Sequence, residues 1–283
     1  MNLHENTDFG RKVFFLNPSP FLKQNIIPAL FDREYEIYTI DSYKNAKNVL
    51  KKFPDSVCFI CIDSTSDNSS SEDEHQLTPD EWYNFIQSFE KDPILSTIFV
   101  GIISESATKT VSDFFQLNTP IPAGFIKLPC EIPELTDIFT GILEINGAKG
   151  RRKFIRANCS NDPDIKVRLS PEQKMSVKDI SFAGLACSGD AKTTENIKPN
   201  ALIRDFVLSI HKNDYKCSGA VLMVSGKENT TELVIIFTKG SSMPFRSAIK
   251  DYIRKTMQDS IDTIIKSYPE DTTDYSIQEP EPE

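Results

Sequence analysis

The sequence predicts a protein of two domains: a doubly wound parallel α/β domain with five strands, then a small six-stranded antiparallel β-barrel with a C-terminal helix. Three observations predict this architecture. The length of 283 residues suits two domains. In the first half, short apolar segments alternate with segments of helix length, as in parallel α/β sheets. In the second half, short strands follow one another without intervening helices, as in small barrels.

The α/β domain is expected at residues 1–146. Apolar strands and amphipathic helices alternate regularly there, and a loop rich in Ser, Asp and Glu interrupts them at 64–74. The strands are expected at 13–16, 35–40, 56–62, 97–103 and 124–127. The helices are expected at 21–31, 42–52, 79–89, 107–117 and 133–145.

Polar residues end three of these strands: Asp63 the third, Ser104 the fourth and Lys127 the fifth. This half thereby resembles a response-regulator receiver domain, in which an Asp accepts a phosphoryl group and a Ser or Thr senses it. Receivers also carry paired acids after the first strand to hold Mg²⁺, but this chain has Asn17 and Pro18. Because Mg²⁺ needs carboxylate ligands, we interpret the domain as a degenerate receiver that serves interaction or dimerisation. Whether Asp63 is ever phosphorylated stays open.

The barrel and its helix are expected at residues 147–268. The strands are expected at 165–169, 175–180, 184–188, 201–211, 215–224 and 232–237. The helix at 245–265 has apolar residues at spacings of three and four, so one face either caps the barrel or pairs with another subunit. The acidic tail at 269–283 is expected to be disordered.

Two short polar clusters stand at the start of this second half. Residues 151–156 read R-R-K-F-I-R, so Arg152 and Arg156 form an R-x-x-x-R pair. Arginine forks bind two phosphate oxygens or the O6/N7 edge of guanine. Residues 179–184 read D-I-S-F-A-G, a D-x-S-x-x-G pattern. It offers an acid to accept guanine N–H groups, a hydroxyl to donate to phosphate, and a glycine that lets the backbone come close.

In this order, and followed by these strands, the two clusters resemble the signature of PilZ domains, bacterial receptors for cyclic di-GMP. The resemblance implies that the arginines clamp the phosphates and guanines of the ligand. It also implies that Asp179 accepts from guanine N1 and N2, that Ser181 bonds nearby, and that Gly184 leaves room for the ligand. The implied binding residues are Arg151, Arg152, Arg156, Asp179, Ser181 and Gly184.

Charge and composition exclude several classes of function. The net charge is −9, and residues 268–283 hold six acids and no Lys or Arg, which argues against general nucleic-acid binding. We expect a cytoplasmic protein without membrane insertion, because neither an apolar leader nor a run long enough to span a bilayer is present. The three histidines are scattered and no P-loop is complete, so we expect neither an enzyme nor a bound metal.

The six cysteines do not predict disulfides in a chain of this size. Cys58 and Cys61 form a C-x-x-C within an expected strand, where residues three apart point to opposite faces. That geometry suits a zinc or redox pair poorly, so buried free thiols are expected.

These observations predict a bacterial receptor for cyclic di-GMP in second-messenger signalling. Ligand binding is expected to order the hinge at 148–156, change the angle between the domains, and expose or hide a surface for an unidentified protein partner. Motility or surface behaviour is the output that the resemblance implies. The alternative is a scaffold whose barrel no longer binds nucleotide. The sequence does not name the partner, and a homodimer stays possible.

Overall fold

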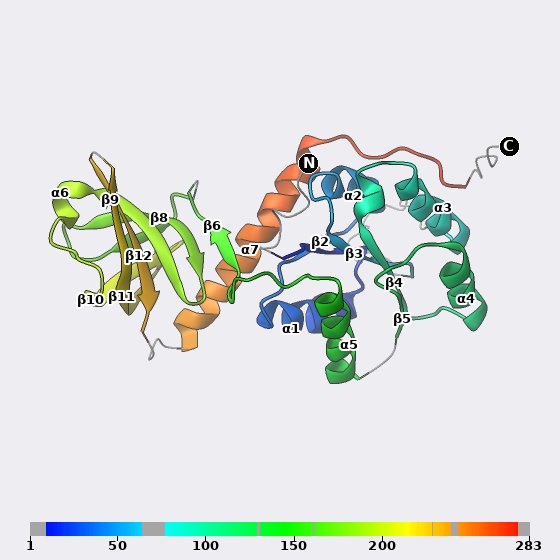
Figure 1. Ribbon diagram of the computed structural model, residues 1–283, viewed down its shortest axis with the longest axis horizontal. Helices are drawn as coiled ribbons and strands as arrows, with labels where there is room; N and C mark the ends of the chain where they lie inside the picture. Colours follow the sequence, from blue (N-terminus) through cyan, green and yellow to red (C-terminus); the bar gives the residue numbers. More distant parts are fainter. Residues whose placement is uncertain are drawn as a thin grey trace. The chain divides into compact units, whose positions relative to one another are not determined.

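The computed structural model describes residues 10–63, 77–128, 131–160, 162–227, 229–238 and 243–276 (Figure 1). The expected loop at 64–74 lies outside these residues. Internal contacts divide the chain into two units. The first comprises Met1–Lys153 with Ile261–Glu283, and the second comprises Phe154–Ser260. The second unit is therefore an insertion, since the chain belongs to the first unit both before and after it.

The first unit contains a parallel sheet of five strands in the order β2-β1-β3-β4-β5. This order confirms the predicted doubly wound α/β fold. All five residues of β3 are buried, as expected for a central strand that is covered on both faces. The strands are β1 (Val13–Leu16), β2 (Ile37–Ile40), β3 (Val57–Cys61), β4 (Phe99–Ser104) and β5 (Phe125–Lys127).

Helices cover both faces of this sheet (Figure 1). On one face, Phe15 and Phe59 pack against Phe139 of α5, with ring centroids 5.6 and 5.0 Å from it. On the other face, Thr78 caps α3 with a reciprocal capping box to Glu81, which fixes where that helix begins. The helical segments are η1 (Leu22–Ile26), α1 (Ile27–Asp32), α2 (Tyr43–Leu50), α3 (Pro79–Glu90), η2 (Leu95–Thr97), α4 (Lys109–Asn118) and α5 (Ile132–Ile145).

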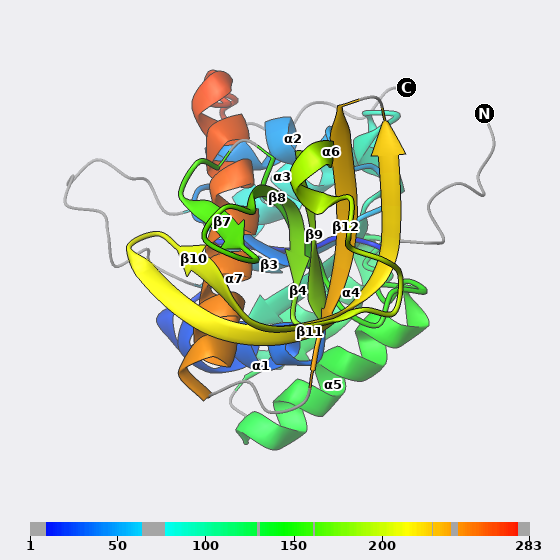
Figure 2. The same cartoon turned by 90° about the vertical axis from the view of Figure 1, so that its left-hand side faces the viewer.

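The second unit is a closed antiparallel barrel of six strands in the order β8-β7-β10-β11-β12-β9, with β9 pairing back to β8 (Figure 2). This confirms the predicted barrel. The short strand β6 was not predicted and pairs with the last residues of β8. The elements are β6 (Arg156–Asn158), β7 (Ile165–Arg168), β8 (Lys174–Ser181), β9 (Gly184–Asp190), α6 (Ala191–Thr194), β10 (Leu202–Ile210), β11 (Asn213–Lys227) and β12 (Thr230–Phe237).

The C-terminal helix α7 (Met243–Ser267) covers part of the barrel with its first turns. The ring of Phe245 lies 5.2 Å from that of Phe237, and the Tyr252 hydroxyl donates to Asp162 at 2.8 Å. The predicted capping role of this helix is thus confirmed, whereas pairing with another subunit stays a prediction. From Ile261 onward the helix belongs to the first unit.

The prediction of a disordered tail is wrong for residues 269–276. This segment packs on the first unit, where Tyr275 is 4% exposed. Its eight residues include three acids, two Thr and one Pro, a composition that gives no sign of the single aromatic anchor near its end. The remaining tail, 277–283, lies outside the described residues. Within the described part of the chain, no helix is both long and apolar enough to cross a membrane.

Candidate functional site

The short strand β6 brings the second arginine of the R-x-x-x-R pair next to the D-x-S-x-x-G motif. β6 runs antiparallel to β8 with Arg156 opposite Ser181 and Asn158 opposite Asp179. Residues 179 and 181 lie on the same side of a strand, so Arg156 and Asp179 share one face as diagonal neighbours. The pairing of β6 with β8 therefore places Arg156 of the R-x-x-x-R pair beside Asp179 of the D-x-S-x-x-G motif.

Arg156 and Asp179 form an ion pair there. The guanidinium Nη1 lies 3.4 Å from the carboxylate Oδ1, and the two side chains are 45% and 35% exposed. An ion pair at this exposure is weak in water, typically about 0–1 kcal/mol. A bound anion can therefore replace Asp179 as the partner of the Arg156 guanidinium at a small cost in free energy. The Asp179 carboxylate is then able to accept a hydrogen bond from another donor.

Ser181 is engaged in the turn between β8 and β9. Its hydroxyl donates to the Gly184 carbonyl at 3.2 Å and accepts from the Ala183 N–H at 3.3 Å. The residue is 7% exposed. Its hydroxyl thus stabilises a two-residue hairpin loop, and its contact with a ligand stays a prediction.

Gly184 is required by packing within the barrel. A Cβ at this position would lie 2.2 Å from the Ile235 carbonyl oxygen on β12, far inside van der Waals contact. The β9–β12 pairing at Gly184 and Ile236 brings that backbone close. This reason for the glycine is independent of any ligand and differs from the role that the resemblance implied.

Arg151 and Arg152 are exposed and precede the second unit, which begins at Phe154. Each of them makes contacts of its own within the described chain. Arg152 and Arg156 are four positions apart in the sequence, so their Cα atoms can be at most about 14 Å apart. Their convergence with Arg156 on one ligand stays a prediction.

Sequence reasoning missed an aromatic and basic cluster beside the motif. Phe182, half-buried in the β8–β9 turn, lies 6.4 Å from the Phe154 ring. Two cations of α7 stand over it, with Arg246 Cζ 5.5 Å and Lys250 Nζ 5.4 Å from the ring centroid. The signal in the sequence is the i, i+4 spacing of the two basic residues on an expected helix, which is informative only when their aromatic partner is known.

The receiver-like half has a small cavity of about 140 Å³ at the carboxyl ends of β1, β3 and β4. Asp63 lines it, and this carboxylate is already in use. Its Oδ2 accepts from the backbone N–H groups of Glu105 and Ser106, and its Oδ1 accepts from the Ser106 hydroxyl at 2.8 Å. The lining residues are Ser19, Pro20, Leu22, Cys61, Asp63, Ile103, Ser104 and Glu105.

Two further receiver positions, Asn17 and Ser104, make hydrogen bonds that hold the fold. Asn17 donates its side-chain amide to the Cys61 carbonyl at 3.1 Å, and Ser104 accepts from the Ala107 N–H at 2.8 Å. Across the described ranges, no three His, Cys, Asp or Glu side chains form a group able to hold a metal ion. The geometry fits a loop-stabilising role for Asp63 better than a phosphoryl acceptor.

The cysteines of the C-x-x-C are buried and free, as predicted. Burial raises the pKa of the Cys58 thiol to about 12 and raises that of Cys61 as well. Because the thiolate is the form that reacts or binds metal, both residues are chemically quiet core residues.

No family model matches the sequence, and no curated protein matches it either. Several solved structures resemble parts of the chain. The PilZ domain of YcgR from Escherichia coli, solved with c-di-GMP, is 11% identical over 40% of this chain and 96% of that one, with a TM-score of 0.34. MrkH of K. pneumonia in complex with c-di-GMP is 18% identical over 42% of this chain, with a TM-score of 0.33.

The match covers 55% of the MrkH chain, so it spans only about half of that protein. A response regulator from Desulfuromonas acetoxidans is 18% identical over 48% of this chain and 97% of that one, with a TM-score of 0.34. At these identities and TM-scores, the ligands of those proteins do not show what this chain binds.

Proposed function

We propose that the second unit binds cyclic di-GMP and that the protein is a receptor rather than an enzyme. The observation that carries this proposal is the exposed Arg156–Asp179 pair, 3.4 Å apart, held between β6 and β8. It presents a fork donor and a carboxylate acceptor side by side on one face. A guanine linked to a phosphate offers the complementary pair of groups.

The chemistry of binding follows from exchanging partners within this pair. A phosphate or the O6/N7 edge of guanine takes the Arg156 fork, and Asp179 then accepts from guanine N1 and N2. Arg152, with Arg151 beside it, closes over the ligand from the preceding segment. Charge-assisted hydrogen bonds of this kind are about twice as strong as neutral ones, so they can replace a weak exposed ion pair.

Phe182 and the two α7 cations add a second contact surface. An aromatic ring and a guanidinium plane both stack on purine bases, and Lys250 adds a positive charge for a dianionic ligand. We place one guanine against Phe182 or Arg246, adjacent to the Arg156–Asp179 pair.

Binding is proposed to order the segment 148–156 and so to change the arrangement of the two units. A protein partner would read that change, with motility or surface behaviour as the output. Small-angle scattering with and without cyclic di-GMP tests this step. Superimposable scattering curves would show that binding leaves the arrangement unchanged.

The alternative function is a scaffold that binds no ligand. Two observations on the D-x-S-x-x-G motif are consistent with this alternative. Ser181 stabilises the β8–β9 turn, and Gly184 is required by the approach of Ile235. Both motif residues would therefore be retained for folding even if nucleotide binding had been lost.

Calorimetric titration decides between the two functions. Arg152→Ala/Arg156→Ala should weaken cyclic di-GMP binding more than a hundredfold, because losing two charge-assisted contacts costs about 3 kcal/mol or more. Arg168→Ala is the matched control, since Arg168 also forms an exposed ion pair on the barrel, at 3.3 Å from Asp214. If cyclic di-GMP and other guanine nucleotides give no binding signal with the wild-type protein, the scaffold is the correct function.

A further inference from the structure

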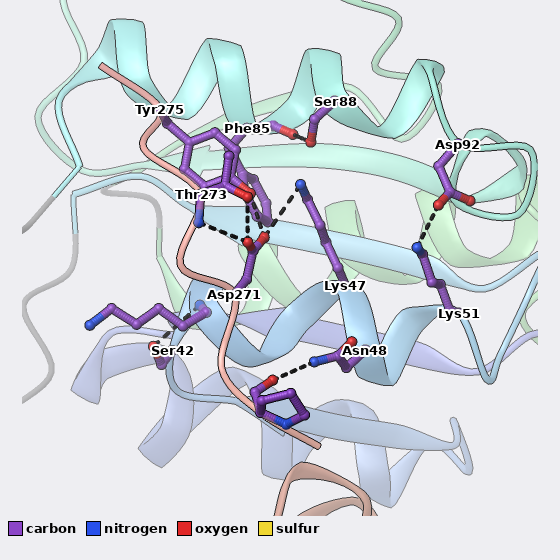
Figure 3. Close-up of polar contacts among 12 residues, drawn as sticks. Ser42, Lys47, Asn48, Lys51, Phe85, Ser88, Asp92, Asp271, Thr273 and Tyr275 are labelled. Atoms are coloured by element: carbon purple, nitrogen blue, oxygen red, sulfur yellow. Dashed lines mark hydrogen bonds and ion pairs between the residues drawn. The ribbon is translucent and has the colours of Figure 1, made fainter. Parts of the chain in front are cut away.

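The segment Tyr268–Ser276, here called the C-terminal strap, lies along the α2–α3 face of the first unit (Figure 3). This docking face is defined by the residues that contact the strap. They are Tyr43, Lys44, Lys47, Asn48, Lys52, Asn84 and Phe85.

Main-chain groups of the strap make most of its polar contacts with the docking face. Asn48 donates to the Pro269 carbonyl at 2.8 Å, and the Asp271 N–H donates to the Lys44 carbonyl at 2.7 Å. Asn84 donates to the Tyr275 carbonyl at 2.8 Å. These contacts need an extended chain but no particular side chain, so a segment of another sequence could make them equally well.

Two side chains of the strap, those of Asp271 and Tyr275, make the sequence-dependent contacts that are shielded from solvent. Tyr275 is 4% exposed, with its ring edge-on to Tyr43 at 6.1 Å and to Phe85 at 5.3 Å. Asp271 lies 3.4 Å from Lys47 and accepts from the Tyr275 hydroxyl at 2.6 Å (Figure 3). The other side chains of the strap are exposed. The docking face therefore selects an acid followed four residues later by an aromatic ring.

The charge of the docking face matches that requirement. Lys47 pairs with Asp271, and its ammonium also lies 4.9 Å from the Tyr275 ring centroid. Lys44 lies 4.0 Å from Glu270. An aromatic anchor flanked by charge-assisted contacts is the usual composition of an interaction hot spot.

We propose that the α2–α3 docking face is a binding site for an extended protein segment with an acid and an aromatic residue four positions apart, and that the C-terminal strap masks this site in cis. The occupant is a partner protein that presents such a segment. The strap has the advantage of being tethered, so a partner must compete with its high effective concentration. This inference does not depend on nucleotide binding.

The strap itself provides the probe for a direct test. A fluorescein-labelled synthetic peptide of residues 267–276 is titrated with the full-length protein and followed by fluorescence anisotropy. Asp271→Ala/Tyr275→Ala should open the docking face and bind the peptide at least tenfold more tightly than the wild-type protein. The peptide that carries Tyr275→Ala should not bind the opened variant.

A matched pair of lysine variants identifies the site of peptide binding. Adding Lys47→Ala to the opened variant should weaken peptide binding at least tenfold. Lys51→Ala lies one turn further along the chain and pairs with Asp92 at 2.6 Å, so it should leave binding unchanged. Equal losses from both variants would show a general effect of positive charge and overturn the proposal.

A measurement on the wild-type protein keeps the proposal testable if the opened variant does not fold. Excess unlabelled peptide should increase hydrogen exchange in residues 268–276 of the full-length protein, because the peptide displaces the strap. Unchanged exchange at saturating peptide, or an opened variant that is folded and binds the peptide no better than wild type, would overturn it.

Discussion

Arg156 and Asp179 lie diagonally across β6 and β8, with Nη1 of the guanidinium 3.4 Å from Oδ1 of the carboxylate. Neither motif places these two residues next to each other in the sequence. The pairing of β6 with β8 brings them together, so that without a ligand they form an ion pair with each other.

Asp179→Asn should separate the two roles of this pair. The amide can no longer accept from both guanine N–H groups, so cyclic di-GMP binding should weaken by about 10- to 100-fold. The free energy of unfolding should change by less than about 1 kcal/mol, because the ion pair is exposed. Calorimetric titration and thermal unfolding measure the two quantities. Asp214→Asn, in the corresponding pair with Arg168, should affect neither strongly.

Gly184→Ala should destabilise the barrel whether or not a ligand binds. The added Cβ would meet the Ile235 carbonyl at 2.2 Å, and backbone cannot move aside as a flexible side chain can. Overpacking of this kind costs about 1–3 kcal/mol, measured by denaturant unfolding. Gly226→Ala is the control, since the nearest atom to its Cβ would be 4.0 Å away. Equal stability of the two variants would contradict the packing role of Gly184.

Arg246→Ala/Lys250→Ala should weaken cyclic di-GMP binding by about tenfold or more, because two cations beside Phe182 would be lost. Arg254→Ala is the control on the same helix. Arg254 pairs with Asp251 at 3.6 Å and is 51% exposed, and its loss should leave the affinity within about twofold. Calorimetry on the three proteins settles the contribution of α7. Unchanged affinity in the double variant, with a wild-type protein that binds, would remove α7 from the site without touching the proposed function.

How far the sequence predicts this molecule depends on how local each signal is. Short apolar runs between segments of helix length predicted the five parallel strands, and short strands without intervening helices predicted the six barrel strands, because burial sets these patterns over whole elements. β6 escaped prediction because three residues, Arg156–Asn158, are too few to show a period, and their pairing with β8 decides their structure. Arg156 and Asp179 were both named as binding residues from the sequence, and that role stays a prediction; the contact between them was not predicted.

The C-terminal strap was mispredicted for a different reason. Its three acids, one proline and two threonines are typical of disordered segments, and an average over the composition does not show the importance of Tyr275. Tyr275 is buried because its ring packs against Tyr43 of α2 and Phe85 of α3, which lie much earlier in the sequence. No local pattern contains that information. Arg246 and Lys250 were missed likewise, since their significance depends on the position of Phe182.

Asp63 should not accept a phosphoryl group. Its carboxylate is occupied by the backbone of Glu105 and Ser106, and the position that supplies acids for Mg²⁺ in receivers holds Asn17 and Pro18. Incubation with acetyl phosphate and Mg²⁺ followed by intact mass spectrometry should show no phosphorylated species. A phosphate adduct on the wild-type protein that is lost in Asp63→Asn would contradict this prediction and restore the phosphoswitch.

Asp271→Asn should loosen the C-terminal strap at neutral pH but not in strong acid. Although burial opposes it, hydrogen bonds from Thr273 and Tyr275 and the charge of Lys47 lower the pKa of Asp271 from 3.8 to about 2. A carboxyl whose pKa is lower in the folded than in the unfolded state stabilises the folded state fully at pH values above its unfolded-state pKa. That contribution is lost as the pH falls through its folded-state pKa.

Hydrogen exchange of residues 268–276 measures this effect as a function of pH. The variant should exchange faster than wild type at pH 7, and the difference should shrink between about pH 4 and pH 2 as Asp271 becomes protonated in the wild-type protein. Asp274→Asn is the control within the strap, because Asp274 bonds to Ser276 in the strap itself. A difference between Asp271→Asn and wild type that persists unchanged at pH 2 would mean that the ionised carboxylate does not hold the strap, and the charge of Lys47 would then have no part in selecting its occupant.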